Sequence, residues 1–368
     1  MKFRAERDAL LNVLTIAGRG ANGSTGQPPT LYLNLNNDEL AVTGANSDLS
    51  ITSKCAVSGG DDGTLALPSR LVSEIVKSLG AGAVEFVGET GEVRITSGRA
   101  EFSVRTVVGS ELQQPKQPSG DVVTVSAVPF AEGLRQVTRA ALSDDTRAPQ
   151  LTGVLATPTD TGLRLVATDS YRLAIRDIHG ISGLSNDDEG MLIPSMALNE
   201  LHRLIGDDDT DVLVTRDEHS ATFVIGETSI TTRLLAGEFP QYQVLIPDSY
   251  KNVLTVNRVA LVDALKRVRV MIRDTKDAST PVRLSFSSNG VELNVQAPEI
   301  GNATDGVSGK YVGDDTTIAF NPTYLLDGLD AIQSDSVTLS IIDTNKPATL
   351  KSADNDDYSY LIMPVRIS

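Results

Sequence analysis

One segment occurs three times along this chain, at intervals of about a third of its 368 residues. Its copies span residues 67–79, 193–205 and 320–332. Their prolines, Pro68, Pro194 and Pro322, lie 126 and 128 residues apart. In each copy a Ser or Thr beside the proline precedes apolar residues spaced three and four apart, which predicts an N-cap followed by a short helix. A repeat of this length predicts a fold built from three copies of one unit.

Each copy also has an earlier amphipathic helix that follows a short extended segment. Its apolar residues are Leu10, Val13, Leu14 and Ala17 in the first copy, Phe130, Leu134, Val137 and Ala141 in the second, and Leu261, Leu265, Val268 and Ile272 in the third. Alternating, strand-like runs lie between and after the helices, at residues 31–33, 40–43, 162–166, 282–286 and 337–341. Two helices on antiparallel strands make an α+β layer, so we expect an α+β fold.

Two loop-like stretches divide the copies. Residues 113–120 are rich in Pro and Gln, and a second linker is expected near residues 247–252. We therefore expect three domains, at residues 1–118, 121–247 and 248–368.

The N-terminus and the single cysteine limit the location and chemistry of the chain. The first eight residues are too charged for a signal peptide, and no apolar run reaches the ~18 residues of a membrane span. We therefore expect a cytoplasmic protein. Cys55 is the only cysteine, so neither an intrachain disulfide nor a thiolate metal cluster is possible.

A search for catalytic motifs finds no recognisable active site. The three histidines, His179, His202 and His219, have no Ser or Cys setting typical of a nucleophilic enzyme. The glycines at 80–82 are followed by no lysine that would reach a phosphate. Acidic loops at 186–189 and 207–209 lack the spacing of a calcium loop and are interpreted as solvated turns. We expect no catalytic residue, no metal and no cofactor.

Two other classes of protein compete with a non-catalytic one. A metal-dependent enzyme, such as a hydrolase or nucleotidyltransferase, would place its site in an acidic loop. It would require Mg²⁺ and lose activity when a carboxylate is replaced. An extracellular adhesion-like repeat protein is disfavoured by the missing signal peptide and the lone cysteine.

Three local sequences add a family resemblance to the repeat. They are Gly-Leu-Arg-Leu-Val-Ala-Thr-Asp-Ser-Tyr-Arg-Leu-Ala at 162–174, Gly-Glu-Phe-Pro-Gln-Tyr-Gln-Val-Leu-Ile-Pro at 237–247, and Tyr-Leu-Ile-Met-Pro-Val-Arg-Ile-Ser at 360–368. Over its whole length the chain resembles bacterial DNA sliding clamps, the beta subunits of DNA polymerase III. Segments 280–286 and 360–366 look most like actinobacterial members.

The resemblance implies a specific assembly. Three two-helix, antiparallel-sheet domains of the DNA clamp fold would make one subunit, and two subunits would close head to tail into a six-domain ring. Such a heterologous interface closes after two copies. The ring would act as a non-catalytic processivity factor that encloses duplex DNA and slides along it without sequence specificity.

The resemblance also implies a groove between the second and third domains. It would receive short peptides from the polymerase III alpha subunit, the clamp loader and repair proteins. The residues that match its lining are Leu151, Thr168, Ser170, Tyr171, Arg172, Leu173, Pro240, Val244, Leu245, Pro347, Ile362, Met363, Pro364, Val365 and Arg366. Most of them are apolar, so we expect leucine or phenylalanine anchors, with Arg172 and Arg366 on peptide carbonyls or an acidic flank.

The net charge of −16 argues at first against DNA binding. However, phosphates sense charge only within roughly 8 to 10 Å at physiological salt, so a local basic surface is sufficient. Cations are expected on the helix faces opposite the core, and acidic residues mainly in loops, although Asp327 and Asp330 on the last helix depart from this pattern. The expected DNA-facing residues are Arg19, Lys77, Arg135, Arg139, Arg203, Lys266 and Arg273.

Two positions depart from the family pattern. Gln27 stands where an arginine near DNA is usual, and Tyr171 stands where histidine is frequent. We expect weaker DNA contact in the first domain and an altered peptide preference. The divergence leaves open whether this is the main replicative clamp or a specialised second copy.

Overall fold

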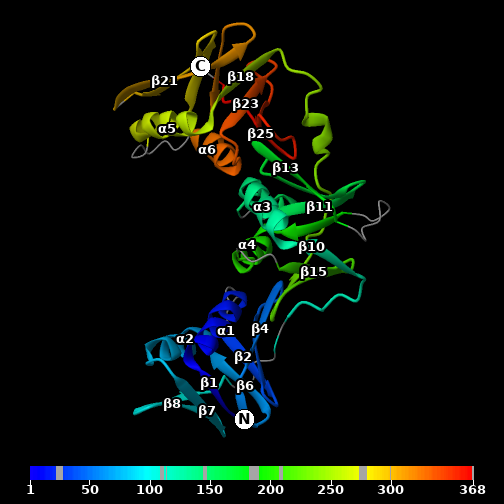
Figure 1. Ribbon diagram of the computed structural model, residues 1–368, viewed down its shortest axis with the longest axis vertical. Coiled ribbons are helices and arrows are strands. Elements are labelled where there is room, and N and C mark those ends of the chain that lie inside the picture. The colour runs from blue at the N-terminus through cyan, green and yellow to red at the C-terminus, as the bar shows by residue number, and fades with distance from the viewer. Residues whose placement is uncertain are drawn as a thin grey trace. The chain divides into compact units, whose positions relative to one another are not determined.

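The computed structural model describes residues 1–21, 28–107, 112, 114–143, 147–181, 190–206, 210–272, 280–298 and 300–366. The chain forms two compact units (Figure 1). Unit 1 contains Met1–Val128 and Met196–Leu235, and unit 2 contains Pro129–Ser195 and Ala236–Ser368. Among the described helices, none is long and apolar enough to cross a membrane.

The first repeat lies wholly in unit 1. Its elements are β1 (Lys2–Glu6), α1 (Arg7–Gly20), β2 (Thr30–Asn36), β3 (Glu39–Ala45), β4 (Leu49–Ala56), β5 (Ser58–Asp61), β6 (Gly63–Pro68), α2 (Ser69–Ser78), β7 (Ala83–Glu89), β8 (Glu92–Ser97) and β9 (Ala100–Arg105). Helices α1 and α2 pack against each other, and α1 also packs on β3 and β4 (Figure 1). Their apolar faces bury Leu10, Leu14, Val72 and Val76 in one hydrophobic core.

The second repeat is divided between the two units. Its elements are β10 (Val122–Ser126), α3 (Ala127–Val137), 3-10 helices Thr138–Ala140 and Pro149–Thr152, β11 (Gly153–Thr159), β12 (Gly162–Thr168), β13 (Arg172–His179), β14 (Met191–Pro194), α4 (Ser195–Leu204), β15 (Asp211–Arg216), β16 (Ser220–Ile225) and β17 (Thr228–Arg233). Strands β10 and β15 to β17 belong to unit 1, whereas β11 to β14 belong to unit 2.

The third repeat lies in unit 2. Its elements are the 3-10 helix Tyr242–Leu245, which precedes it, β18 (Asn252–Asn257), α5 (Arg258–Arg269), the 3-10 helix Val270–Ile272, β19 (Val282–Ser287), β20 (Gly290–Ala297), β21 (Gly301–Val312), β22 (Thr316–Phe320), α6 (Pro322–Ala331), β23 (Ser336–Ile341), β24 (Ala348–Ser352) and β25 (Tyr358–Ile362). The observed α+β architecture of three two-helix units agrees with the fold class that the sequence predicts.

Each repeat joins the next by the same antiparallel strand pairing. At the first joint, β17 pairs with β4 of the preceding repeat, with Thr232 opposite Leu49. At the second joint, β25 pairs with β13, with Ile362 opposite Arg172. The pairings produce an eight-stranded sheet in unit 1, in the order β10-β15-β16-β17-β4-β3-β2-β6, and a twelve-stranded sheet in unit 2, in the order β14-β11-β12-β13-β25-β24-β23-β18-β21-β20-β19-β22. A five-stranded sheet, β5-β1-β7-β8-β9, completes unit 1.

The starts of the second helices differ from the sequence prediction. Helix α2 begins at Ser69, and its N-cap is Pro68, which provides no side-chain cap. The Ser69 amide donates instead to the Pro29 carbonyl at 2.9 Å, so the neighbouring strand satisfies it. In α6 the cap is Asn321, whose side chain accepts from the Thr323 and Tyr324 amides. The predicted Ser or Thr cap is therefore wrong for both helices, because the proline lies at or before the first helical position.

Candidate functional site

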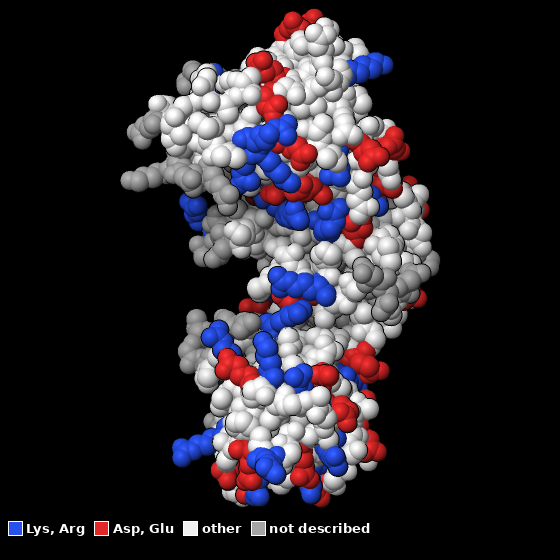
Figure 2. Space-filling model, turned by 60° about the vertical axis from the view of Figure 1, so that its left-hand side comes forward, with Lys and Arg blue, Asp and Glu red and all other residues white. Residues whose placement is uncertain are grey.

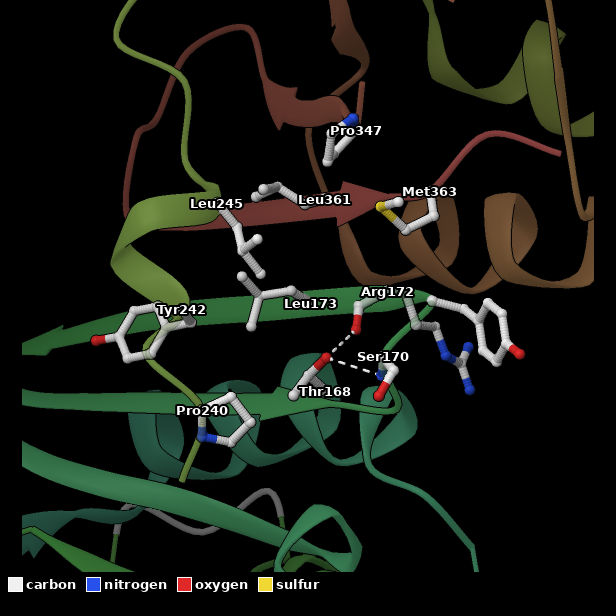
Figure 3. Close-up of a pocket in the computed structure, with 11 residues that line it drawn as sticks. Thr168, Ser170, Arg172, Leu173, Pro240, Tyr242, Leu245, Pro347, Leu361 and Met363 are labelled. Carbon is white, nitrogen blue, oxygen red and sulfur yellow. Dashed lines mark hydrogen bonds between the residues drawn. The ribbon is translucent and has the colours of Figure 1, made fainter. Parts of the chain in front are cut away.

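A pocket of about 210 Å³ lies beside the second joint in unit 2 (Figure 3). Eleven residues line it: Thr168, Ser170, Tyr171, Arg172, Leu173, Pro240, Tyr242, Leu245, Pro347, Leu361 and Met363. They come from the end of β12, the loop after it and the start of β13, from the segment around the 3-10 helix Tyr242–Leu245, from the residue before β24, and from the end of β25 and the residues after it. The pocket therefore combines residues of the second and third repeats.

A small apolar cluster forms one wall of the pocket. Leu173 and Leu361 lie opposite each other in the β13–β25 pairing. They pack with the buried residues Val166, Ile175 and Tyr242. The Tyr242 ring also meets Phe239 edge to face, with centroids 6.3 Å apart. Buried side chains of this kind cannot easily move, so the wall of the pocket formed by this cluster is rigid.

The loop between β12 and β13 forms one wall of the pocket and is fixed by its own hydrogen bonds. Asp169 Oδ1 accepts from the Tyr171 amide at 2.9 Å and the Arg172 amide at 3.0 Å. Thr168 Oγ1 donates to the Arg172 carbonyl at 2.6 Å and accepts from the Ser170 amide at 3.1 Å. Ser170 takes a φ of 74°, a conformation uncommon for residues other than glycine. The resulting turn leaves Tyr171 63% exposed at the rim.

The Arg172 guanidinium is bound within the protein. Its Nε donates to Asp169 Oδ2 at 2.9 Å, and its Nη1 donates to the Asp327 carboxylate. Its Cζ lies 4.3 Å from the centre of the Tyr324 ring. In Figure 3 the side chain points away from Leu173 and Leu245. From the sequence, Arg172 is expected to bind the carbonyls or the acidic flank of a peptide. In the structure its guanidinium is paired with two carboxylates of the protein itself.

Burial and charge both act on the ionisable groups here. Burial alone would lower the pKa of Arg172, but Tyr360 and the Asp327 carboxylate outweigh this effect and raise it. Burial raises the pKa of Tyr360 well above the usual range of a phenol. Arg172 therefore stays charged and Tyr360 stays neutral at physiological pH.

Nine of the predicted groove residues line the pocket, and the other six are not among its lining residues. Leu151 is 8% exposed in the 3-10 helix Pro149–Thr152, Val244 is 78% exposed, and Ile362 is fully buried. Pro364 and Val365 are half-buried and Arg366 is exposed; the Val365 amide donates to the Ala319 carbonyl at 2.8 Å, so this tail follows β22.

The sequence interpretation missed Tyr242 and Leu361 as pocket residues. The alternation of a strand would have identified Leu361, because neighbouring residues of β25 face opposite sides of the sheet. Ile362 accordingly lies on the same side as Tyr360, whose ring contacts α6.

The predicted DNA-facing cations have different surroundings. Lys77, Arg139 and Lys266 are exposed. Glu200 pairs with Arg203 and also lies 3.7 Å from Arg19. Arg273 lies outside the described residues. Figure 2 shows the basic side chains next to acidic ones on the face that it presents.

Arg135, one of the predicted DNA-facing residues, is bonded within the protein. It pairs with Glu132 and donates to the carbonyls of Asp330 at 2.9 Å and Ala331 at 2.8 Å. These carbonyls end α6, where a helix needs external donors. The side chain therefore connects α3 of the second repeat to α6 of the third.

The described residues contain no cluster of three or more His, Cys, Asp or Glu side chains suited to a metal ion. The acidic loops at 186–189 and 207–209 lie outside the described residues. Among the histidines, His179 bonds to Asp357 at 3.0 Å and Thr161 at 2.9 Å. Burial raises the pKa of the Cys55 thiol, which makes it less reactive.

Three two-helix units joined by sheet pairing, with an apolar pocket at the second joint, define a clamp-type repeat protein. Models of the DNA polymerase III beta subunit match the chain in order: the N-terminal domain at residues 1–114, the central domain at 124–241 and the C-terminal domain at 243–366. The chain belongs to the DNA polymerase III beta subunit family, the bacterial sliding clamps. It is therefore a non-catalytic processivity factor of DNA replication.

Individual relatives agree with this assignment along the whole chain. The beta sliding clamp of Streptomyces coelicolor is 31% identical over 380 residues, which cover 100% of both chains. That of Staphylococcus epidermidis is 29% identical over 378 residues, covering 100% of this chain and 99% of the relative. The crystal structure of the Bacillus subtilis clamp matches with a TM-score of 0.93 at 26% identity and covers 100% of both chains. The predicted likeness to actinobacterial members is confirmed by the Streptomyces relative.

Proposed function

We propose that two copies of this chain close head to tail into a ring around duplex DNA, and that the pocket at the second joint holds partner proteins by short peptides. The single observation that carries the proposal is the apolar pocket, which is built from two repeats of a sliding-clamp fold. The proposed domains are residues 1–118, 121–247 and 248–368, and the proposed location is the cytoplasm, where a bacterial clamp would meet DNA.

The strand pairing of the two joints supports the head-to-tail dimer. At each joint, the last strand of one repeat pairs with the third strand after the first helix of the preceding repeat: β17 with β4, and β25 with β13. The equivalent strands without such a partner are β9 of the first repeat and residues 301–308 of β21 in the third. If β9 of one chain pairs with β21 of the other, the same strand pairing forms a third joint between two chains. Two such joints close six repeats into a ring.

Exposed cations support the proposed contact with DNA. Lys77, Arg139, Arg203 and Lys266 lie near the ends of helices or their 3-10 extensions and are exposed. Arg19 is half-buried and shares Glu200 with Arg203. Contacts from such residues to phosphates weaken with salt and carry no sequence information. Weak contacts within a closed ring allow sliding while the ring prevents escape.

The pocket supports binding of a peptide with apolar anchors. Leu245 is 48% exposed and Met363 is 40% exposed, so apolar surface is available to a ligand. The flexible Met side chain adapts to more than one anchor. Competing peptides from the polymerase alpha subunit, the clamp loader and repair proteins would then exchange on one surface without ATP.

Sedimentation equilibrium and DNA retention test the ring. We expect a dimer of about 78 kDa, twice the 39.1 kDa chain. After loading by a matched clamp loader, it should remain on nicked circular DNA and leave linear DNA by its ends. A monomer, or equal retention on both forms, would overturn the ring and make an acidic-loop enzyme worth testing.

A pair of aspartate substitutions tests the pocket. Leu245→Asp places a charge in the apolar wall and should weaken binding of a partner peptide at least 10-fold, about 1.4 kcal/mol. Val122→Asp is the control, because Val122 is 61% exposed and lies on β10 of unit 1, whereas the pocket belongs to unit 2. Fluorescence anisotropy with a labelled peptide measures both; equal affinities would exclude this pocket as the peptide site.

A further inference from the structure

Two residues of α6 contact the pocket loop without lining the pocket. Asp327 accepts from Arg172 Nη1, and the Tyr324 ring lies under the Arg172 guanidinium. The Tyr324 ring also stacks with Tyr171, with centroids 6.5 Å apart. The third repeat thus contacts both Arg172 and the exposed rim residue next to it.

Arg172 links these contacts to the backbone of the loop. Its amide bonds to Asp169, and its carbonyl accepts from Thr168, so both ends of the turn meet at this residue. Its side chain is 11% exposed, and the Asp169 side chain is 5% exposed. Without Asp327, the guanidinium would keep one carboxylate partner, and the uncommon φ of Ser170 would have less support.

Helix α6 is itself held firmly. Tyr360 on β25 donates its hydroxyl to the Tyr324 carbonyl at 2.8 Å. Gly328 lies directly on the Tyr360 ring, with no space for a side chain. At the other end of the helix, Arg135 and Gln136 donate to the Ala331 carbonyl at 2.8 and 3.0 Å. A helix fixed at both ends can serve as a rigid support for Arg172.

We propose that Asp327 is a positioning residue that holds Arg172, and through it the loop 168–172, in the conformation that keeps the pocket open for a peptide. The inference rests on the proposed peptide-binding function and adds a residue of the third repeat to it. A wall that is already ordered lowers the entropy lost on binding, so affinity depends on Asp327 although Asp327 does not line the pocket.

Peptide affinity gives the first test. The probe is a fluorescein-labelled extended peptide with adjacent Leu and Phe anchors, measured by anisotropy on the full-length protein. Asp327→Ala and the isosteric Asp327→Asn should each raise the dissociation constant about 10-fold, mainly through faster dissociation. The control is Asp330→Ala, which removes the same charge from the exposed side of the same helix and should leave affinity unchanged. Wild-type affinity in both Asp327 variants would overturn the inference.

A double-mutant cycle with Arg172→Ala separates positioning from direct contact. If Asp327 acts through Arg172, the double variant binds no more weakly than Arg172→Ala alone. Fully additive losses would mean that Asp327 meets the peptide itself, and would overturn the positioning role.

Hydrogen exchange of the free protein tests positioning without any peptide. The Tyr171 and Arg172 amides, which bond to Asp169, should exchange faster in Asp327→Asn, while the helical amides of α6 keep their protection. Unchanged exchange at these two amides would contradict the inference. If the wild-type protein bound no peptide but its loop loosened in the variant, the proposed function would fail while the structural role of Asp327 stood.

Discussion

The two joints between repeats have the same backbone pairing and different side chains. At the first joint, hydroxyl groups cross the strands: Ser53 and Thr228 bond at 2.9 Å. An ion pair across this joint, between Arg19 and Glu200, is long at 3.7 Å. At the second joint, Arg172 bonds to two carboxylates, and Arg135 donates to the end of α6.

The difference shows how the second joint builds its pocket. Backbone pairing fixes which strands meet, and it is common to both joints. At the second joint, the chain adds the turn at Ser170 and the 3-10 helix Tyr242–Leu245, which rise beside the strands and enclose the pocket. The ion pairs of Arg172 with Asp169 and Asp327 then hold the turn in place. Substitutions at the second joint should therefore be the more damaging.

The largest effect is expected for Gly328→Ala. A Cβ at this position would lie 2.6 Å from Tyr360 Cδ1, and Tyr360 is fully buried, so the ring or the helix must shift. We expect a loss of about 3 kcal/mol in the free energy of unfolding, typical of overpacking a rigid core. Urea denaturation measures it. Gly80→Ala is the control, because a Cβ there meets nothing within 4 Å. Equal stability of the two variants would mean that α6 is not tightly packed on β25.

The next largest effect distinguishes two arginines that the sequence placed together. Arg135→Ala removes the donor from the exposed Asp330 carbonyl and one of the two donors from the partly buried Ala331 carbonyl, and it leaves Glu132 without its ion pair. The substitution should lower stability by about 2 kcal/mol. Arg139→Ala removes an exposed cation and should change stability little but weaken binding to duplex DNA at low salt. Urea denaturation and titration with duplex DNA, each carried out on both variants, test this prediction. A stable Arg135→Ala variant with reduced DNA affinity would restore the sequence interpretation.

These two arginines show what the sequence can predict. The repeat and the amphipathic helices depend on local periodicity and spacing, so the fold class follows from them. Most of the pocket follows from the family resemblance that the local sequence motifs carry. The partner of Arg135 lies 195 residues away, and helical periodicity reports only that the side chain leaves the core of its own repeat. For the same reason the sequence did not reveal the ion pair of Arg172, because its partner Asp327 comes from another repeat. Contacts between repeats require the structure.

A smaller effect is expected at the first joint. Glu200 is 13% exposed and is shared by Arg203 and Arg19, so Glu200→Gln should lower stability by about 0.5 to 1 kcal/mol. The loss should shrink as salt rises, because the two arginines are partly solvated. Thermal unfolding at low and high salt measures it. A loss as large as that of Arg135→Ala would abolish the difference between the joints.

The smallest effect concerns acid stability at the second joint. Partial burial raises the pKa of Asp357, but hydrogen bonds from Asn355 and His179 outweigh this and lower it below its ordinary value of 3.8. A carboxylate with a lowered pKa stabilises the fold above its ordinary pKa, and this contribution disappears as pH falls through the lowered value. Asp357→Asn should therefore cost a few tenths of a kcal/mol at about pH 5.5, with a difference from wild type that shrinks as the pH falls through the lowered pKa.

Asp356→Asn is the matched control for this titration. The Asp356 side chain is 87% exposed and pairs with Lys351 at 3.3 Å, so its removal should give a smaller difference across the same pH range. Urea denaturation at several pH values compares both variants with wild type. If the Asp357→Asn difference persisted unchanged at acid pH, the stabilisation would come from the shape of the side chain and not from its charge. In that case the hydrogen bonds of Asp357 with His179 and Asn355 would stabilise the joint equally well with an uncharged side chain at this position.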